Sequence, residues 1–435
     1  MHRRTRLAAG LAVLATALTA TTAGASTPPL PGNRSVPPVY AKAETPALFD
    51  DDAGGNSNAD DPAIWYNSAH PGSSLVLGTA KQGGLDVYRL DGSLVQSLPA
   101  PSAPAAGSAP GRFNNVDVLT GVRFPDGRRS DVAVVTDRGR DRVHFYRIDP
   151  GRPAAPLTEV TDAAVPRAFS ATEADVDDQY TAYGTAAWRD PRTGRSYLLA
   201  SRRHTADVGL FEIRVTPTGT VTYRKVRTLT LPSTFHTPGG TWSPCEDPGD
   251  GPQIEGLTVD AARGVAYLGQ EDVGVWKISA NLTGTPELVD RTDQFGVPAV
   301  YDPVSDECVP GADPGYGGDH LVADAEGLTL FRAPSGRQYL IVSSQGDYTY
   351  SVYDTSRGDR WTGAFRVASG PSVDGSEETD GIAATGQALG TAFPHGLFVA
   401  QDGYNAPATG DDGDRTDTNY KLVDLSDVLR AAGVR

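Results

Sequence analysis

Histidine, cysteine and methionine are scarce in this chain of 435 residues, which has seven, two and one of them respectively. No pair of histidines forms an H-E-x-x-H motif, and neither cysteine lies near a histidine at zinc-binding spacing. The G-x-S-x-G signature of serine hydrolases is also missing. These absences argue against a zinc enzyme and against a covalent serine intermediate. A metal-activated water is the simpler nucleophile.

Basic residues and long apolar runs are also few. Lysine and arginine total 38 against 54 aspartates and glutamates, which gives a formal net charge of −16. We therefore expect no nucleic-acid partner, because phosphate backbones require a basic surface. An anionic substrate would need bound cations to mediate its contact with so acidic a protein. No apolar run is long enough to span a membrane, so no membrane association is expected.

The first residues have the pattern of a secretory signal peptide. Basic residues that include Arg3 and Arg4 precede a short apolar stretch, and small residues lead to Ala25. We expect residues 1–25 to be removed and the protein to be secreted. The paired arginines fit either a twin-arginine signal or an ordinary secretory one. Residues 26–45 are rich in proline, which predicts a linker or an arm.

The two cysteines are Cys245 and Cys308. Thiols of an exported protein generally pair, so we expect a disulfide between them. Two separate buried thiols are the alternative. A cross-link over this separation would stabilise the fold by about 4 kcal/mol in the chain-entropy model.

One strand pattern recurs six times. Each copy has a β-rich run, a turn with Gly or Asp, and a second run ending in an aromatic and an aliphatic residue, which predicts a hairpin. Adjacent copies lie about 54 to 72 residues apart. β-Helix repeats are shorter than this, and β-sandwiches lack such a repeated sequence pattern. We therefore predict an all-β fold, a six-bladed β-propeller over residues 46–435. The hairpins fall at 74–92, 131–149, 196–214, 264–279, 338–355 and 396–426.

A short acidic element precedes each hairpin. We expect these elements to be the innermost strands, whose carboxylates converge at one end of the channel and repel unless cations neutralise them. Oxygen ligands without histidine or thiolate favour calcium before magnesium. For any single acidic element, the alternative is that its Asp-Gly or Glu-Gly sequence only forms a turn or a kink at the end of a strand. The elements begin at Asp60, Asn114, Ala182, Ile254, Ala325 and Thr379, and their acids include Asp60, Asp61, Asp117, Glu255, Asp324, Glu326 and Asp380.

A second set of residues in the repeats is cationic or phenolic: Lys81, Arg138, Arg202, Arg203 and Tyr183. These side chains would either form salt bridges with the carboxylates or clamp phosphate oxygens. Calcium ions together with basic side chains would make a mixed site for a polyanion. Such a site resolves the conflict between an acidic protein and an anionic substrate.

Several of these segments resemble the β-propeller phytases, which are alkaline, calcium-dependent enzymes. The resemblance runs from about Asp60 to about Val423 and rests on the ordered blocks DDPAIW, NNVDV, IEGLTVD, DAEGLTLF, SSQG, ETDGI, GLFVAQDG and NYKLV. It implies six blades and several bound calcium ions. It also implies hydrolysis of phytate (myo-inositol hexakisphosphate) as its calcium complex, by a 3-phytase-type phosphoric monoester hydrolase.

The resemblance also implies roles for individual residues. The implied catalytic residues, which hold calcium, are Asp60, Glu255, Glu271, Asp324 and Glu326. The further implied calcium ligands are Asp61, Gln345, Asp374, Asp380, Asp402 and Asn405. The implied phosphate-binding residues are Lys81, Arg138, Tyr183 and Arg203.

Two features depart from the family pattern. Where the family has a lysine this chain has Arg202-Arg203, of which Arg203 aligns better. Residues 232–252 and 294–320 look like insertions with one cysteine each, and we expect the disulfide to join them at the channel rim.

Two other functions fit part of the pattern. A calcium-dependent propeller lactonase or esterase usually needs one ion, fewer carboxylates and no basic set. A non-catalytic extracellular propeller would bind a ligand and use calcium only for stability. The phytase hypothesis accounts for both the acidic and the basic residues, and it predicts a monomer that acts on calcium-phytate.

Overall fold

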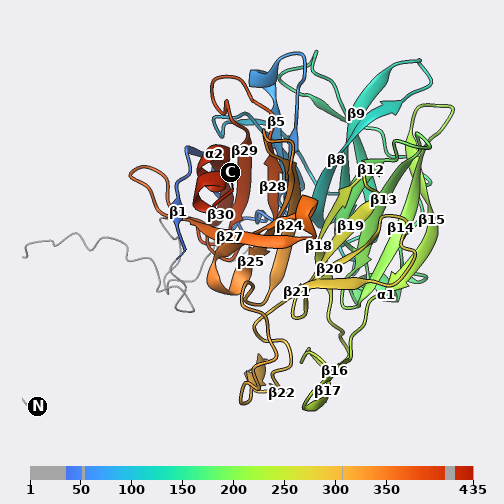
Figure 1. The fold of residues 1–435 in the computed structure, drawn as a ribbon. Coiled ribbons are helices and arrows are strands. Elements are labelled where there is room, and N and C mark those ends of the chain that lie inside the picture. The colour runs from blue at the N-terminus through green and yellow to red at the C-terminus, as the bar shows by residue number, and fades with distance from the viewer. Residues whose placement is uncertain (1–35, 51–53, 306, 407–416, 435) are drawn as a thin grey trace, which may run out of the picture.

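The strands of the chain group into six blades (Figure 1). The computed structural model describes residues 36–50, 54–305, 307–406 and 417–434. The predicted signal peptide and the first half of the predicted arm, residues 26–35, therefore lie outside the described residues. Within those residues there are two short α-helices, α1 (Glu173–Asp177) and α2 (Leu425–Ala431), and no helix is long and apolar enough to cross a bilayer. The predicted six-bladed propeller is confirmed.

Blades 1 to 4 each have four antiparallel strands in chain order. Blade 1 comprises β4 (Pro62–Trp65), β5 (Leu75–Thr79), β6 (Leu85–Tyr88) and β7 (Leu94–Leu98). Blade 2 comprises β8 (Phe113–Arg123), β9 (Arg129–Asp137), β10 (Arg142–Ile148) and β11 (Leu157–Glu159). Blade 3 comprises β12 (Ala182–Arg189), β13 (Ser196–Arg202), β14 (Asp207–Val215) and β15 (Val221–Thr230). Blade 4 comprises β18 (Ile254–Asp260), β19 (Val265–Gln270), β20 (Gly274–Ser279) and β21 (Glu287–Arg291).

Blades 5 and 6 combine strands from both ends of the chain. Blade 5 comprises β24 (Ala325–Arg332), β25 (Gln338–Ser344), β26 (Thr349–Asp354), β27 (Arg360–Val367) and the N-terminal β1 (Pro38–Val39). Blade 6 comprises β28 (Ile382–Thr385), β29 (Leu397–Asp402) and β30 (Asp417–Asp424), with β2 (Ala43–Glu44) and β3 (Leu48–Phe49) both paired to β30.

The first strand of each blade lies at the centre of the molecule. The strands β4, β8, β12, β18, β24 and β28 contact one another in that order, and β28 returns to β4. They therefore form a closed ring around the channel. These are the strands predicted to be innermost, and the predicted hairpins form the second and third strands of their blades.

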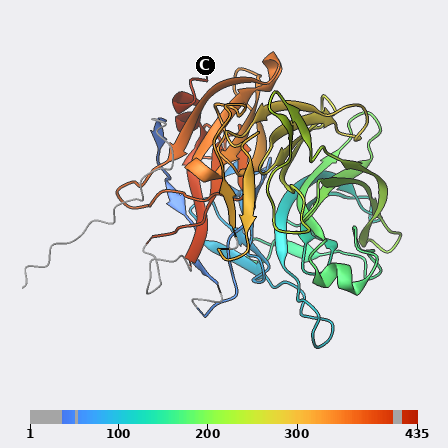
Figure 2. The same cartoon turned by 90° about the horizontal axis from the view of Figure 1, so that it is seen from below.

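The N-terminal segment closes the ring. Strand β2 pairs with β30, where Ala43 lies opposite Leu422, and Lys42 Nζ lies 2.8 Å from Asp424 Oδ2. Strand β1 pairs in parallel with β27. We expected residues 26–45 to be a linker or arm, but the described end of this range covers strands that would otherwise be open edges. Figure 2 shows the N-terminal strands, in blue, beside the C-terminal strands, in red.

The hydrophobic core is divided among the blade interfaces. Each of the six buried clusters joins side chains of two neighbouring blades. Between blades 5 and 6, for example, the fully buried rings of Tyr350 and Phe398 lie 5.1 Å apart by their centroids. Burying one such side chain contributes about 1.5–3 kcal/mol. Because no blade covers its own faces, the ring is stable only when it is complete.

A β-bulge recurs at the start of four inner strands, β8, β12, β18 and β24. In β18, for example, the register shifts between Ile254 and Leu257, which leaves Glu255 and Gly256 in the bulge. A bulge re-aims a side chain that would otherwise follow the strand alternation. A Cβ on Gly256 would lie 2.2 Å from the carbonyl oxygen of Glu326 on the next blade. In the recurring Glu-Gly sequence, the bulge therefore redirects the glutamate carboxylate. The glycine allows the backbones of neighbouring inner strands to approach closely.

Two hairpins lie outside the blades and project from them (Figure 1). They are β16 (Phe235–Thr237) with β17 (Gly240–Trp242), and β22 (Ala299–Asp302) with β23 (Glu307–Pro310).

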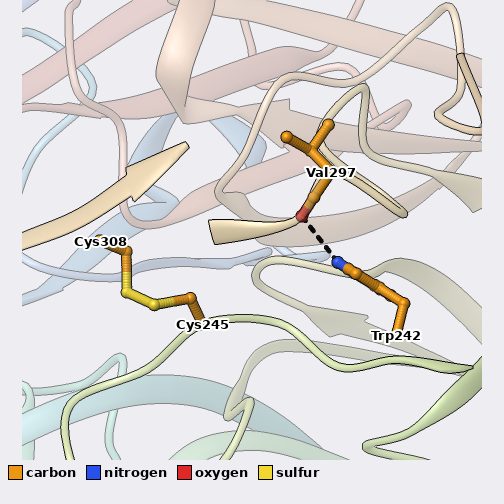
Figure 3. Close-up of a disulfide and its surroundings, with 4 residues drawn as sticks. All are labelled: Trp242, Cys245, Val297 and Cys308. Atoms are coloured by element: carbon orange, nitrogen blue, oxygen red, sulfur yellow. Dashed lines mark hydrogen bonds between the residues drawn. A yellow bond between two sulfur atoms is a disulfide. The ribbon is translucent and has the colours of Figure 1, made fainter. Parts of the chain in front are cut away.

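The predicted disulfide joins the segments that carry these hairpins. Cys245 and Cys308 are bonded across a sequence separation of 63, and their Cα atoms lie 6.0 Å apart (Figure 3). Nearby, Trp242 Nε1 donates a hydrogen bond of 2.7 Å to the carbonyl oxygen of Val297. The indole also lies 4.7 Å from the Phe295 ring by centroids. The two insertions are thus held together, as predicted.

Candidate active site at the channel mouth

Several of the candidate functional side chains come from two positions that recur in the blades. The first position is the bulge of the inner strand, and the second directly follows the second strand. Because equivalent positions of a propeller face the same end of its channel, these side chains gather at one mouth. The bulges supply Asn114, Tyr183, Glu255 and Glu326, and the positions after the second strands supply Arg138, Arg203, Glu271 and Gln345.

The centre of the acidic part is formed by Glu255, Glu271 and Glu326. Each offers a carboxylate oxygen, and these oxygens lie within 4.8 Å of one another in buried positions. Burial and the charge of Asp60 raise the pKa of Glu255 to about 8. Burial and the charge of Asp324 raise the pKa of Glu271 well above its ordinary value. Such a group either retains protons or needs a cation.

Two oxygens of this cluster are suited to bind a cation. Glu271 Oε1 and Glu326 Oε2 are buried and have no hydrogen-bond partner among the described residues. The donors are all carboxylate oxygens, which suit a hard divalent ion such as calcium. Gln253 Nε2 orients the other oxygen of Glu271 through a hydrogen bond of 2.9 Å. The chemistry of the donor set therefore agrees with the cation predicted from the sequence.

Further predicted ligands extend the acidic cluster toward blade 1. Burial and the charge of Asp272 raise the pKa of Asp324 to about 7. Gln345 Nε2 donates a hydrogen bond of 2.8 Å to Asp380 Oδ1. Lys81 Nζ lies 3.4 Å from Asp380 Oδ2 and 3.7 Å from Asp60 Oδ2. Lys81 thus lies where the acidic part meets the basic part.

Two aspartates turn to the backbone of the next blade. Asp61 Oδ2 accepts a hydrogen bond of 3.0 Å from the Val116 amide, and Asp117 Oδ2 accepts one of 2.7 Å from the Ala187 amide. The inference that Asp117 converges with the other acids is wrong, because the bulge in β8 shifts the register ahead of it. Asn114 holds the equivalent position instead, and its Nδ2 donates to Glu255 Oε1 at 2.7 Å.

The predicted phosphate-binding residues of blades 2 and 3 lie beside this cluster. Arg138 Nη1 donates to Asn114 Oδ1 at 3.2 Å, and its guanidinium lies 5.8 Å from the centroid of the Tyr183 ring. Burial and the charge of Arg138 lower the pKa of Arg203, so these two groups are close. Arg202 turns away, since its Nε donates to the carbonyl oxygen of Tyr180 at 3.1 Å. The structure therefore places Arg203, and not Arg202, beside Arg138.

Sequence analysis missed two residues of the mouth. Burial and the charge of Arg138 lower the pKa of Arg112 to about 10. Burial and the charge of Asp272 raise the pKa of Glu246, which follows Cys245 in the first insertion, to about 9. Arg112 stands just before the NNVDV block, and Glu246 stands in an insertion, so no repeat marked either of them.

Three predicted calcium ligands gather elsewhere, on blade 6. Asp374, Asp402 and Asn405 surround the buried ammonium of Lys421, which lies 3.2 Å from Asp402 Oδ2 and 3.1 Å from Asn405 Oδ1. Glu44 of β2 joins them, with its Oε2 at 2.6 Å from Lys421 Nζ. The predicted ligands therefore form two groups. The blade 6 group contains a cationic side chain at its centre, whereas no lysine or arginine in the described part of the chain forms an ion pair with Glu255, Glu271 or Glu326.

Comparison with known proteins shows to which family the chain belongs. The sequence profile of the Phytase family matches residues 5–239 and 309–433. The chain belongs to the phytase family. A 3-phytase of Bacillus subtilis (strain 168) is 32% identical over 400 residues, which cover 91% of this chain and 85% of that protein. The resemblance stated above and the prediction of a phytase-type hydrolase are confirmed.

The family profile leaves out residues 240–308 of this phytase. Both cysteines and Glu246 lie in this interval, and so do Glu255 and Glu271 of blade 4. Among solved structures, a periplasmic gluconolactonase of Pseudomonas aeruginosa is 16% identical, with a TM-score of 0.36 over 69% of this chain and 68% of that one. A similarity this low does not bear on the chemistry of the mouth.

Proposed function

We propose that this phytase is a secreted phosphomonoester hydrolase that releases phosphate from phytate with calcium ions held at the channel mouth. One observation carries the proposal. Among the described residues, arginines without an ion-pair partner lie beside buried carboxylate oxygens without a hydrogen-bond partner, in a chain of the phytase family. The first group suits an anion and the second suits a cation. Calcium-phytate supplies both.

The basic residues would hold the phosphate to be cleaved. Arg138 and Arg203 carry fixed positive charge, and their N–H groups match phosphate oxygens. Burial and the charge of Glu255 raise the pKa of Tyr183 well above its ordinary value, so its hydroxyl stays protonated. It can therefore donate a hydrogen bond to a phosphate oxygen. Lys81 would bind at the boundary with the acids.

The acidic residues would hold the calcium ions. Glu255, Glu271, Asp324, Glu326 and Asp60 are the proposed ligands nearest the reaction, with Asp380 and Gln345 beside them. Bound calcium would neutralise phosphate charge and activate a water for attack on phosphorus. The carboxylates themselves fix the positions of these ions, and Asn114 and Gln253 orient two of the carboxylates through hydrogen bonds.

Other parts of the proposal concern stability and location. Asp61 on blade 1, with Asp374, Asp402 and Asn405 on blade 6, would hold calcium in a structural role. Export is proposed on the basis of the signal-peptide pattern, and the disulfide fits an oxidising compartment. The exported chain is proposed to act as a monomer.

The decisive experiment measures phosphate released from phytate by the mature chain, with calcium added and with a chelator. We expect release that depends on calcium and returns when calcium is restored. A lactone and a carboxylic ester serve as control substrates. Absence of phosphate release at every calcium concentration would exclude the proposal, and lactone hydrolysis without phosphate release would favour the lactonase alternative.

A further inference from the structure

His204 lies beside the channel mouth, where blade 3 meets the end of the first insertion. It directly follows Arg203, one of the predicted phosphate-binding residues. Its amide donates a hydrogen bond of 3.1 Å to Gln253 Oε1, and its carbonyl oxygen accepts one of 3.1 Å from the Gly251 amide. Its φ is 60°, in the left-handed region that histidine and asparagine enter more readily than most residues. The backbone at this position is thus fixed.

An aspartate of the first insertion holds the imidazole ring. Asp250 Oδ2 lies 2.5 Å from His204 Nδ1, and the Tyr180 ring makes a T-shaped contact with the imidazole at 5.6 Å between centroids. Among the described residues the other ring nitrogen, Nε2, has no hydrogen-bond partner, and the side chain is 20% exposed. Because the carboxylate holds a proton on Nδ1, Nε2 is the atom that can exchange a proton with a ligand or with solvent.

The charges around this ring depend on whether an anion is bound in the mouth. Burial and the charge of Arg203 lower the pKa of His204, the charge of Asp250 opposes them, and the charge of Arg138 adds to the lowering. A phosphate bound to the two arginines would compensate their charge and add a negative charge of its own. The imidazole is therefore most readily protonated when an anionic substrate is bound.

The two parts of the mouth set the direction of attack on such a substrate. In phosphoryl transfer the attacking and leaving oxygens lie on opposite sides of phosphorus. The carboxylate oxygens without partners, on Glu271 and Glu326, belong to blades 4 and 5 and mark the side from which water attacks. The leaving oxygen of a phosphate held by Arg138 and Arg203 then faces away from these carboxylates, toward the side on which His204 lies.

We propose that His204 is a catalytic residue, the general acid that protonates the leaving oxygen of the phosphate ester, and that Asp250 positions its ring. This inference rests on the proposed function of the channel mouth and deepens it. As the water oxygen bonds to phosphorus, the bond between phosphorus and the alcohol oxygen breaks, and that oxygen takes the proton from Nε2. One proton of the water stays on the phosphate product, and the other passes to solvent. The exposed imidazole recovers its proton from solvent.

The test compares an alkyl with an aryl phosphate in variants of the mature chain at saturating calcium. The alkoxide of phytate needs a proton to leave, whereas p-nitrophenolate leaves without one. For His204→Asn we expect kcat for phytate to fall about a hundredfold, the lower range for a general acid, and kcat for p-nitrophenyl phosphate to fall at most about threefold. Asparagine tolerates the left-handed backbone and can donate to Asp250, but it cannot transfer a proton. His236→Gln, exposed on β16 of the same insertion, should change neither substrate.

The dependence on pH separates proton donation from a structural role. In the parent, kcat for phytate should decline at alkaline pH as His204 loses its proton, and this decline should be absent in His204→Asn. Asp250→Asn should move the decline to lower pH, because the carboxylate that raises the pKa is gone. Equal losses on the two substrates, or the same alkaline decline in His204→Asn as in the parent, would overturn the inference.

A titration by NMR keeps the inference separate from the proposed function. If the parent chain releases no phosphate from phytate, the proposed function fails, whatever the variants do. Inorganic phosphate still probes the position of the ring in a chain with labelled histidine. Saturating phosphate should raise the pKa of His204 by about one pH unit, since a bound anion favours the imidazolium. A rise that is lost in Arg138→Gln supports the inference. A pKa that phosphate leaves unchanged, or raises equally in that variant, overturns it.

Discussion

The two halves of the channel mouth share a backbone design but differ in charge. In blades 2 and 3 the bulge and the position after the second strand carry no acid, whereas in blades 4 and 5 they carry mainly acids. The first set is Asn114, Tyr183, Arg138 and Arg203, and the second set is Glu255, Glu326, Glu271 and Gln345. We call these sets the basic half and the acidic half.

The comparison shows how a repeat fold divides its tasks. The bulges and turns fix where side chains stand, and the residue in each blade decides the chemistry. The two halves do not simply neutralise each other. Lys81 forms ion pairs at the boundary, while Arg112 and Arg203 have no acidic partner among the described residues. Both halves therefore remain available for a ligand that combines anions with cations.

The largest expected effect comes from removing a charge in the acidic half. Glu326→Gln keeps the shape of the side chain but takes away a proposed calcium ligand. Turnover of phytate should fall at least about a hundredfold, a loss comparable to that of removing a main electrostatic contributor. The stabilisation by added calcium should also shrink, because part of the ligand-linked stability is lost. Phosphate release and thermal unfolding with and without calcium are the measurements.

Glu287→Gln is the matched control for this variant. Glu287 begins the outer strand of blade 4, next to the blade of Glu326, and is exposed, so the same charge is removed away from the mouth. It should keep both turnover and the response to calcium. Parental turnover in Glu326→Gln would contradict the role proposed for the acidic half.

A smaller loss of activity is expected when a charge is removed from the basic half. Arg138→Gln removes a hydrogen bond to Asn114 and the cation–π contact of the guanidinium with the Tyr183 ring. We expect kcat/KM for phytate to fall about ten- to a hundredfold. The calcium concentration that gives half-maximal activity should change much less, because the carboxylates remain intact. Arg147→Gln, on a surface pair with Asp126, is the control. A large shift in calcium dependence would show that the halves are not separable.

The six blades could be predicted from the sequence, but the pairing of the N-terminal strands with the last blades could not. Alternation and turn residues mark each hairpin locally, so six repeats were visible. Strand β2 has only two residues, in a proline-rich stretch, and pairs with a strand near the other end of the chain. No local pattern encodes such a pairing. For the same reason Glu44 was missed as a neighbour of Lys421.

Site residues could be predicted where the same sequence pattern recurs in different blades. Glu255 and Glu326 were found because each precedes a glycine in the same strand position. Asp117 was misplaced because alternation along a strand does not reveal a bulge, which shifts every later side chain. Arg112 and Glu246 have no counterparts in other blades, so only the folded chain brings them to the mouth.

Removing the disulfide tests whether the two insertions affect the acidic half of the mouth. Replacing Cys245 and Cys308 together by serine should lower the free energy of unfolding by up to about 4 kcal/mol, measured by denaturant titration. Since the first insertion also carries Glu246, the calcium dependence of activity should shift as well. Reducing agent should reproduce both effects in the parent and change nothing in the double variant. Unchanged stability and calcium dependence would show that the insertions are independent of the acidic half.

The smallest expected effect concerns a histidine beneath the basic half. His144 Nε2 lies 3.2 Å from Asp137 Oδ2, and its Nδ1 lies 3.0 Å from Glu159 Oε1. Although burial lowers it, these carboxylates raise the pKa of His144 to about 9. The other oxygen of Asp137 accepts the Arg112 amide, so this histidine supports the backbone of the basic half.

Because the folded state binds this proton more tightly than the unfolded chain, the protonated histidine stabilises the fold. The contribution is complete below about pH 6.5, the pKa of an unperturbed histidine, and disappears as the pH rises through about 9. It should amount to about 3 kcal/mol. The unfolding temperature of the parent should therefore exceed that of His144→Gln near pH 6, and the gap should narrow by pH 10. His395→Gln, whose ring is largely exposed, is the control for losing a histidine. A gap that stays constant over this range would mean that His144 contributes by packing and not by its charge.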